Sequence, residues 1–106
     1  MKRGSVYWIN LEPSKAPEFG KVRPCLIVSN SEQNLHIPTL VVIPLSSKAP
    51  EIWPLRLKIT FNKKNSYAVM PGIRQVSKQR LADRIGVLSG EEIQRVDEAL
   101  RAYLSD

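Results

Sequence analysis

The sequence offers few side chains for chemistry, and the most informative of them is Arg23. It stands directly before Pro24 and the apolar run 25–28, which is typical of a strand. The guanidinium would then lie where a strand begins, so that a rigid sheet holds it toward an anionic ligand. Because arginine keeps its charge near neutral pH and presents a planar fork of donors, Arg23 suits phosphate recognition. The alternative interpretation is an ordinary surface arginine before a strand.

Other catalytic constellations lack the residues they need. His36 is the only histidine and Cys25 the only cysteine, so a zinc cluster has too few ligands and an internal disulfide is excluded. We expect His36 in a solvated loop between strands, and Cys25 as a small buried hydrophobe rather than a reactive thiol. No glycine-rich phosphate loop precedes a helix, which leaves nucleotide hydrolysis without support. Any chemistry must use arginine, hydroxyl groups, carboxylates or the backbone.

The size of the chain sets the scale of the fold that positions these groups. Its 106 residues, of which 42% are hydrophobic, suit one domain over residues 1–106 with a modest core. No apolar run reaches the roughly 18 residues of a membrane span. The first residues lead into a short strand rather than into the apolar region of a signal peptide. We therefore expect a cytoplasmic protein with no membrane association.

The net charge of +6 is unevenly distributed. Residues 1–82 hold 13 Lys and Arg against 4 Asp and Glu, whereas residues 83–106 hold 3 against 6. A basic surface attracts polyanions at long range and makes their binding sensitive to salt. The charge therefore indicates a partner that is either nucleic acid or an acidic protein segment, although many basic small proteins bind no nucleic acid.

Short segments rich in Val, Ile, Tyr and Trp recur between proline-marked turns, as is typical of strands. Five such segments predict a small antiparallel sheet or barrel. The central one is apolar on both faces, and Pro44 should end its pairing or put it at an edge. Residues 12–22 form a long exposed loop of the kind that carries function. The five predicted strands cover residues 6–11, 23–29, 39–45, 55–61 and 67–76.

A helix at the C-terminus has the clearest local signals. Ser89 and Glu92 form a capping box, in which Ser89 accepts from the amide of Glu92 and Glu92 reaches back to the amide of Ser89. After that start, apolar residues recur at helical spacing and make one stripe that should pack on the sheet. The stripe consists of Ile93, Val96, Leu100, Tyr103 and Leu104.

Four blocks of the sequence point together to a known family. They read RGSVYWINLEP at 3–13, EFGKVRPCLIVSN at 18–30, VIPLSS at 42–47 and IRQVSKQRL at 73–81. In this order they resemble the MazF/PemK toxins of bacterial type II toxin–antitoxin modules. The resemblance covers nearly the whole chain, and four ordered blocks are far more specific than any one of them.

The resemblance implies a fold and an activity. The fold would be mainly β with α, a small SH3-like antiparallel β-barrel of the CcdB/PemK type with a C-terminal helix, usually a homodimer. The activity would be cleavage of single-stranded RNA, often messenger RNA, at short sequences and with no metal or other cofactor. The usual antagonist is an antitoxin whose acidic, flexible segment lies across the RNA-binding groove, which agrees with the basic charge of this chain.

The resemblance also implies roles for individual residues. Arg23 matches the family's active-site arginine and would stabilise the charge that grows on the phosphoryl oxygens. Ser46 aligns with the active-site threonine and would hold the phosphate or relay a proton, unless it is only a turn serine; Ser47 replaces it if the alignment is off by one. Glu18 is the remaining catalytic candidate. The expected RNA contacts are Phe19, Lys21, Ser47, Arg74, Lys78 and Arg80.

Two positions depart from the pattern of the family. Many relatives have Ser or His before a Glu-Gln pair in the first loop, where this chain has Pro17-Glu18-Phe19. Others have an acidic residue and Gln before the Ile-Arg block, where this chain has Pro71-Gly72. Both departures remove polar groups that would contact RNA. Phe19 would compensate by stacking on a splayed base, or it would pin the loop to the core.

Two alternative functions stay open at this point. A catalytically weak relative would bind RNA or antitoxin without cleaving RNA, as the two prolines suggest. A gyrase poison like the related CcdB toxins would share the fold. Those toxins depend on an aromatic C-terminal end, whereas this chain closes with Tyr103-Leu104-Ser105-Asp106.

Overall fold

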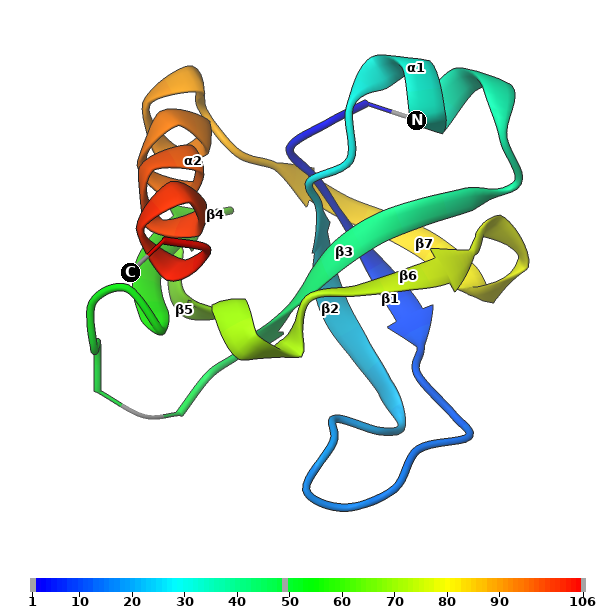
Figure 1. The fold of residues 1–106 in the computed structure, drawn as a ribbon, viewed down its shortest axis with the longest axis horizontal. Coiled ribbons are helices and arrows are strands. Elements are labelled where there is room, and N and C mark those ends of the chain that lie inside the picture. Colours follow the sequence, from blue (N-terminus) through cyan, green and yellow to red (C-terminus); the bar gives the residue numbers. More distant parts are fainter. Residues whose placement is uncertain (1, 49, 106) are drawn as a thin grey trace.

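The computed structural model describes residues 2–48 and 50–105, in which seven strands form one sheet (Figure 1). Two α-helices and two short 3₁₀ turns connect or follow the strands in these ranges. In chain order the elements are β1 (Ser5–Asn10), β2 (Val22–Ile27), α1 (Ser31–His36), β3 (Thr39–Ser46), β4 (Arg56–Phe61), β5 (Lys64–Val69), η1 (Met70–Gly72), β6 (Arg74–Ser77), η2 (Lys78–Arg80), β7 (Leu81–Val87) and α2 (Gly90–Tyr103).

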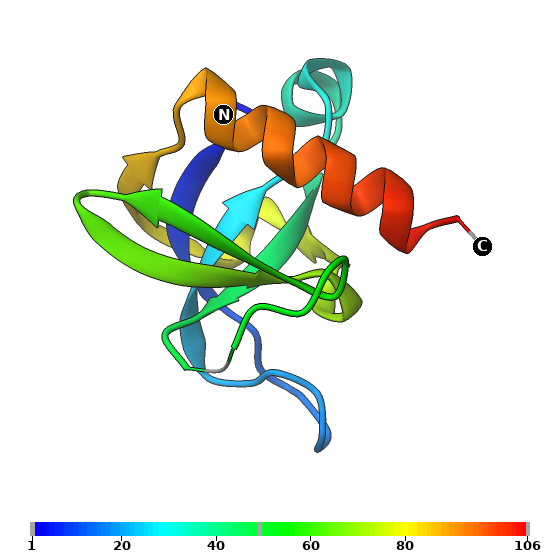
Figure 2. The same cartoon turned by 90° about the vertical axis from the view of Figure 1, so that its left-hand side faces the viewer.

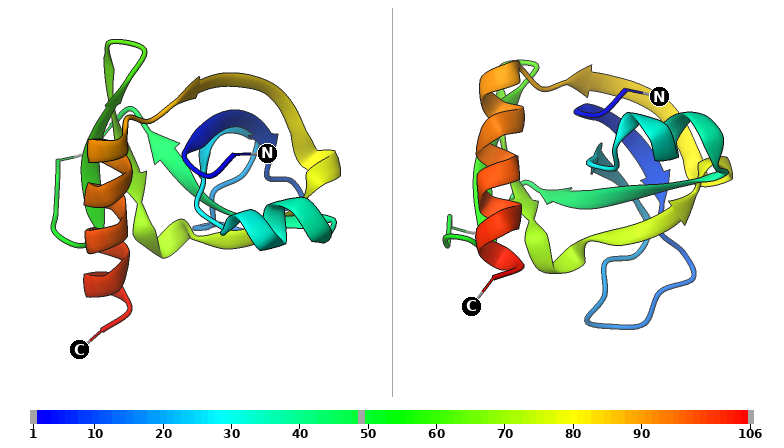
Figure 3. Two further views of the ribbon diagram at one scale, coloured as in Figure 1. Left: turned by 90° about the horizontal axis from the view of Figure 1, so that it is seen from above. Right: turned by 45° about the horizontal axis from the view of Figure 1, so that its top comes forward.

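The sheet is antiparallel throughout. Its strand order is β4-β5-β3-β2-β1-β7, and β6 pairs with β3 on the side where β5 also pairs. Since β3 has different neighbours along its length, the sheet curls into a half-barrel, which Figure 3 shows from two directions. The prediction of a mainly β fold of SH3-like type with a C-terminal helix is confirmed.

Two apolar cores cover the two faces of the central strands. Side chains alternate along β2, so that Leu26 points to one core and its neighbours Cys25 and Ile27 to the other. The first core is closed by α2, which crosses that face of the sheet (Figure 2). The second core lies within the half-barrel and includes Val42 of β3 and Val76 of β6. The candidate site described below lies at the end of this second core.

The predicted strand at 67–76 is wrong in its continuity. β5 ends at Val69, η1 contains Pro71 and Gly72, and β6 begins at Arg74. Pro71 has no N–H and cannot continue a ladder of hydrogen bonds. The chain therefore turns at η1, and β5 pairs with β4 and the end of β3, whereas β6 pairs with the start of β3.

Two elements were absent from the prediction. β7 pairs with β1, but most of its residues are exposed or only half-buried, so it lacks the apolar alternation of a strand. The segment around His36 is not a loop but the end of α1, where His36 itself is exposed. Asn30 caps this short helix by accepting from the amide of Gln33 at 2.9 Å.

Pro44 does not end the pairing of β3, as had been expected, and β3 is a central strand. Pro44 lies opposite Cys25 of β2 and is buried. On the other side of β3, pairing with β6 stops at Val42 and pairing with β5 begins at Leu45. Pro44 thus lies where β3 changes its neighbour, which is where a residue without an N–H disturbs the sheet least.

Helix α2 begins as predicted, with one difference in its cap. The Ser89 hydroxyl accepts from the amide of Glu92 at 3.2 Å. The Glu92 carboxylate does not return to Ser89 but accepts from the amide of Thr60 on β4, at 2.7 Å. The predicted stripe packs in the first core except for Leu104, which follows the helix and is 73% exposed.

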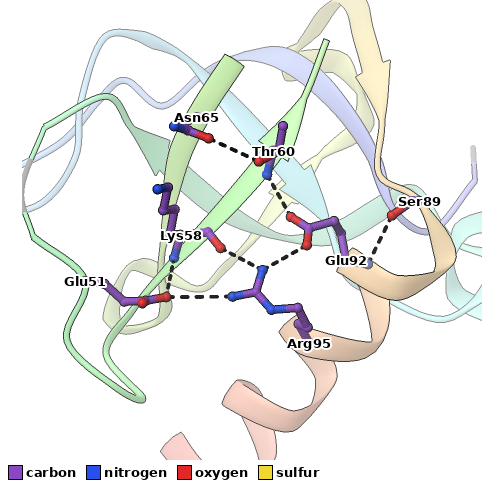
Figure 4. A network of polar contacts seen from close by, with 7 residues as sticks. All are labelled: Glu51, Lys58, Thr60, Asn65, Ser89, Glu92 and Arg95. Atoms are coloured by element: carbon purple, nitrogen blue, oxygen red, sulfur yellow. Dashed lines mark hydrogen bonds and ion pairs between the residues drawn. The ribbon is translucent and has the colours of Figure 1, made fainter. Parts of the chain in front are cut away.

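Polar side chains cover the outer edge of β4, the first strand in the sheet order (Figure 4). Glu51 accepts from the amide of Lys58 at 2.9 Å, and Arg95 donates to the carbonyl of Lys58 at 3.0 Å. Arg95 also pairs with Glu92 at 2.8 Å. An exposed edge with free backbone groups invites pairing with other chains, so these contacts protect the sheet. No helix in the described ranges is long and apolar enough to cross a membrane.

Candidate active site

Arg23 lies near the start of β2, half-buried at the end of the second core. Its Nε donates to the carbonyl of Gly20 at 3.1 Å, and its Cζ lies 4.8 Å from the centre of the Phe19 ring. Within the described residues, its Nη1 and Nη2 have no hydrogen-bond partner. The guanidinium is thus held along one side and on one face, while its terminal nitrogens remain available to an anion.

Ser46 is brought to the same end of the sheet by the register of β2 and β3. Cys25 lies opposite Pro44, where the pairing of β2 with β3 ends, and Arg23 precedes Cys25 by two residues while Ser46 follows Pro44 by two. Sequence reasoning placed these two residues together through the family pattern; in the structure Arg23 lies near the start of β2 and Ser46 at the end of β3, the neighbouring antiparallel strand.

The hydroxyl of Ser46 is already engaged in a turn. Its Oγ donates to the carbonyl of Lys48 at 3.0 Å and accepts from the amide of Lys48 at 3.2 Å. A hydroxyl oxygen accepts two hydrogen bonds, so one acceptor position remains. To donate to a phosphate, the proton must leave the Lys48 carbonyl. Ser47 is exposed and follows the end of β3.

The loop between β1 and β2 faces η1 across a cavity of about 490 Å³. Glu18 and Phe19 reach it from the loop, and Arg74 reaches it from β6. The carboxylate of Glu18 accepts from the amide of Lys15 at 2.9 Å through one oxygen. Prolines and apolar side chains dominate the walls. The lining residues are Leu11, Pro13, Pro17, Glu18, Phe19, Val69, Pro71, Gly72, Ile73 and Arg74.

Phe19 is packed into the molecule rather than extended from the loop. It is half-buried and lies against the second core. A Cβ at Gly72 would lie 3.3 Å from Cδ2 of Phe19 and 2.4 Å from Cγ of Pro44. Only glycine leaves room for both rings at this point. The departure Pro71-Gly72 therefore has a structural consequence, because it allows Phe19 to sit close to β3.

Three predicted RNA contacts bind backbone carbonyls in this structure. Arg74 Nη1 donates to Leu11 at 3.3 Å, and Arg80 Nη1 donates to Asn10 at 3.1 Å and also to Glu12. These two arginines hold the base of the β1–β2 loop. Lys78 Nζ donates to Asn34 at 2.6 Å and lies against α1. Arg74 thus lines the cavity, Arg80 binds the base of the loop, and Lys78 binds α1 instead.

Glu12 organises the loop, and sequence reasoning gave it no role. Its Oε1 accepts from the Ser14 hydroxyl at 2.7 Å and from the amide of Lys21 at 2.9 Å. These hydrogen bonds, that of Ser14 above all, hold the pKa of the Glu12 carboxyl below its ordinary value. The side chain of Lys21 itself is exposed, so its ammonium is accessible to a phosphate. The sequence signal that could have pointed to this role of Glu12 is the Glu-Pro pair directly before a long loop.

Within the described ranges, no group of three or more His, Cys, Asp or Glu side chains is arranged to hold a metal ion. Cys25 is buried, as predicted from its place in an apolar run. Burial raises the pKa of its thiol to about 12, although the charges of Arg74 and Arg23 oppose the shift. A thiolate nucleophile at Cys25 is therefore ruled out near neutral pH.

A curled antiparallel sheet with a C-terminal helix, and an arginine whose terminal nitrogens have no hydrogen-bond partner within the described ranges, define a small β protein that presents a cation at one end of its sheet. Residues 2–104 match the model of the PemK-like, MazF-like toxins of type II toxin–antitoxin systems. The chain belongs to this family, which confirms the resemblance drawn from the four sequence blocks.

Individual relatives agree with the family match. The endoribonuclease EndoA of Bacillus subtilis is 34% identical over 110 residues, which cover 99% of this chain and 95% of that protein. A mycobacterial endoribonuclease in complex with its cognate antitoxin has a TM-score of 0.82 at 25% identity, covering 98% of this chain and 94% of that one. MazF of Deinococcus radiodurans shares the fold, with a TM-score of 0.83 at 20% identity over 98% of this chain and 96% of that one.

Proposed function

We propose that this protein is the toxin of a type II toxin–antitoxin module and acts as an endoribonuclease on single-stranded RNA, at short sequences and without a metal ion. The family of the chain and the activity of its relative EndoA support this. The observation that carries the proposal within the molecule is Arg23, whose guanidinium is held in place while Nη1 and Nη2 have no hydrogen-bond partner among the described residues.

The proposed chemistry is attack of the RNA 2′-hydroxyl on the adjacent phosphate. Arg23 stabilises the charge that grows on the phosphoryl oxygens, which is the role of a preorganised cation. Ser46 holds the scissile phosphate from the neighbouring strand. Glu18, which has one carboxylate oxygen bound to Lys15 N and lines the cavity, is the candidate to draw off or return a proton. The products are a 2′,3′-cyclic phosphate and a free 5′-hydroxyl.

The proposed contacts to the rest of the RNA are Lys21, Ser47 and the part of Arg74 that Leu11 does not occupy, whereas the ring of Phe19 lies against Arg23 instead. Arg80 and Lys78 belong to this set only if RNA displaces the backbone carbonyls that they bind. The proposed antagonist is the acidic, flexible segment of an antitoxin, which suits a chain of net charge +6; one structural relative was solved with its cognate antitoxin. The homodimer is part of the proposal, and light scattering of the purified protein tests it.

The decisive experiment incubates a long single-stranded RNA with the protein in EDTA, alongside two variants. Arg23→Ala removes the proposed catalytic cation, and Arg101→Ala removes the same charge from an exposed position on α2. We expect discrete cuts ending in 2′,3′-cyclic phosphate, a loss of about 10²- to 10³-fold in rate for Arg23→Ala, and wild-type cleavage for Arg101→Ala. Circular dichroism of both variants checks the fold.

Four results would count against the proposal. Intact RNA with the wild-type protein would favour a relative that binds RNA or antitoxin without cleavage. Cuts that disappear in EDTA would contradict a metal-free mechanism. An unfolded Arg23→Ala variant would show that Arg23 is structural, and growth arrest with intact transcripts and broken DNA would indicate a gyrase poison instead.

A further inference from the structure

The orientation of Arg23 depends on Phe19, which has no role in the proposed chemistry. One face of the guanidinium lies on the ring of Phe19, with Cζ 4.8 Å from the ring centre. A cation over an aromatic face within about 6 Å is attracted by the negative face of the ring. The second contact is the bond from Nε to the carbonyl of Gly20. Together they fix both the position and the plane of the group.

Other arginines of this chain are held in a different way. Arg3 uses both terminal nitrogens on the carboxylate of Asp97. Arg74 and Arg80 each use Nη1 on backbone carbonyls, and Arg95 uses Nη1 and Nη2 on acceptors at the edge of β4. In each of these cases at least one terminal nitrogen of the guanidinium is occupied. At Arg23 a contact through the ring face replaces such bonds and leaves the fork free.

The ring of Phe19 is held firmly enough by its packing to orient the guanidinium of Arg23. Phe19 packs against the second core, and the missing side chain of Gly72 lets the ring approach η1 and Pro44 closely. The base of the loop that carries Phe19 is fixed by Arg74 and Arg80. A ring held in this way loses little freedom when the cation settles on it, so the orientation of Arg23 exists before the substrate arrives.

We propose that Phe19 is a positioning residue for Arg23: its ring fixes the plane of the guanidinium so that Nη1 and Nη2 face the scissile phosphate. This inference rests on the proposed function for its catalytic consequence, but the contact itself is independent of it. Phe19 is therefore not a platform for a base on the face that Arg23 covers. Removal of the ring should slow the chemical step rather than weaken RNA binding, because the charge of Arg23 remains while its orientation is lost.

The test compares Phe19→Leu with Phe19→Tyr. Leucine keeps an apolar side chain against Pro44 and Gly72 but removes the aromatic face, whereas tyrosine keeps that face. We expect kcat to fall about 2- to 30-fold in Phe19→Leu, as the loss of one cation–π contact implies, with KM nearly unchanged. We expect Phe19→Tyr to remain within about 2-fold of the wild type. Thermal unfolding of both variants shows whether the loop is intact.

A second readout observes the contact without RNA. Side-chain protons of Arg23 that lie over the ring should show an upfield ring-current shift in the NMR spectrum, identified by its absence in Arg23→Lys. We expect the shift to persist in Phe19→Tyr and to vanish in Phe19→Leu. If the wild type cleaves no RNA but shows this shift, the proposed function fails and the positioning contact stands.

Two outcomes would overturn the inference. The first is a wild-type spectrum with no upfield shift for Arg23, whatever the activity. The second is a Phe19→Leu variant whose kcat equals that of the wild type, or whose KM rises while kcat is unchanged. The latter pattern would assign Phe19 to base stacking instead, because stacking contributes to binding in the ground state as well as in the transition state.

Discussion

Arg23 and Arg80 show the same functional group put to two uses near one loop. Arg80 donates to the carbonyls of Asn10 and Glu12 and thereby fixes the place where β1 leads into the loop. Within the part of the chain that the structure describes, Arg23 makes one side-chain hydrogen bond, through Nε to the carbonyl of Gly20, and its terminal nitrogens have no partner. A cation that donates to backbone carbonyls in this way supports the site without touching a substrate. The number of arginines near a site is therefore a poor guide to the number of phosphates it binds.

Cys25 gives a prediction at the same scale, because its thiol is buried. Burial raises the pKa from an ordinary 9.0 to about 12, so the folded state holds the proton more tightly than the unfolded state. At pH 8 the native thiolate fraction should be about 10³-fold smaller than in the unfolded chain. Labelling with a thiol-specific chromogenic reagent should be slow in the native protein and fast in denaturant. Rapid labelling of the native protein at pH 8 would contradict this.

The sign of the shift also sets a limit on stability at high pH. A group whose pKa is raised by folding contributes stability that is complete below the unfolded pKa, near 9, and is lost as the pH rises toward 12. Cys25→Ala removes this contribution and serves as the control. Its stability should fall less steeply than that of the wild type over this range of pH, although lysines and tyrosines titrate in both proteins.

Residues of the site could be predicted from the sequence where a local signal accompanied them. Arg23 stands before an apolar run, which places it at a strand end, whereas Ser46 after the next run was identified through the resemblance to the family. The contacts that organise them could not be predicted in this way. The bonds from Arg74 and Arg80 join residues more than sixty positions apart, and the seat of Phe19 depends on a side chain that Gly72 lacks. Such contacts exist only once the sheet has curled.

Among the elements, α2 could be predicted from the sequence and β7 could not, because they differ in where their backbone hydrogen bonds are made. A helix satisfies its backbone bonds within itself, so its cap and its apolar spacing are both local features of the sequence. β7 obtains its bonds from β1, at the opposite end of the chain, and its residues need not alternate to gain them. The break at Pro71 was visible in the sequence. The different pairing on its two sides was not: β5 pairs with β4 and the end of β3, whereas β6 pairs with the start of β3.

The cap of α2 leads to a prediction for the first turn of the helix. Glu91 and Glu92 are neighbours with the same charge at the same helix end. Only Glu92, whose side chain is 17% exposed, also binds the amide of Thr60 and the guanidinium of Arg95. Either substitution by alanine removes one favourable interaction with the helix dipole. Glu92→Ala should cost about 1–2 kcal/mol more in unfolding free energy, since it also frees a backbone amide on β4.

Urea unfolding of both variants measures this difference directly. Glu92→Gln provides a further control, because an amide oxygen can accept from Thr60 without the negative charge. Equal losses of stability in Glu91→Ala and Glu92→Ala would show that the contact with β4 contributes nothing beyond the helix dipole. Increased self-association of Glu92→Ala is a second expected result, because the outer edge of β4 would then be open to pairing.

For the whole molecule, the question is whether the net charge of +6 acts as a diffuse field or through a defined surface. The chain offers a matched pair of lysines with which to answer it. Lys21 lies in the β1–β2 loop and Lys63 in the β4–β5 hairpin, which project from different parts of the molecule (Figure 2). Both are exposed, and both have positive φ angles, 63° for Lys21 and 62° for Lys63. Alanine at either position therefore removes the same charge at a similar backbone cost.

If phosphates are bound at the candidate site, the two substitutions should differ in their effect on RNA affinity. Each phosphate contact on a single strand contributes about 0.7 to the slope of log K against log salt concentration. Lys21→Ala should reduce that slope by about 0.7, and Lys63→Ala should leave it unchanged. Fluorescence anisotropy with a labelled single-stranded RNA, measured at several salt concentrations, gives both slopes. Equal reductions of the slope in the two variants would mean that the basic charge attracts RNA without a defined path across the loop. An affinity independent of salt would mean that the basic surface does not contribute to RNA binding.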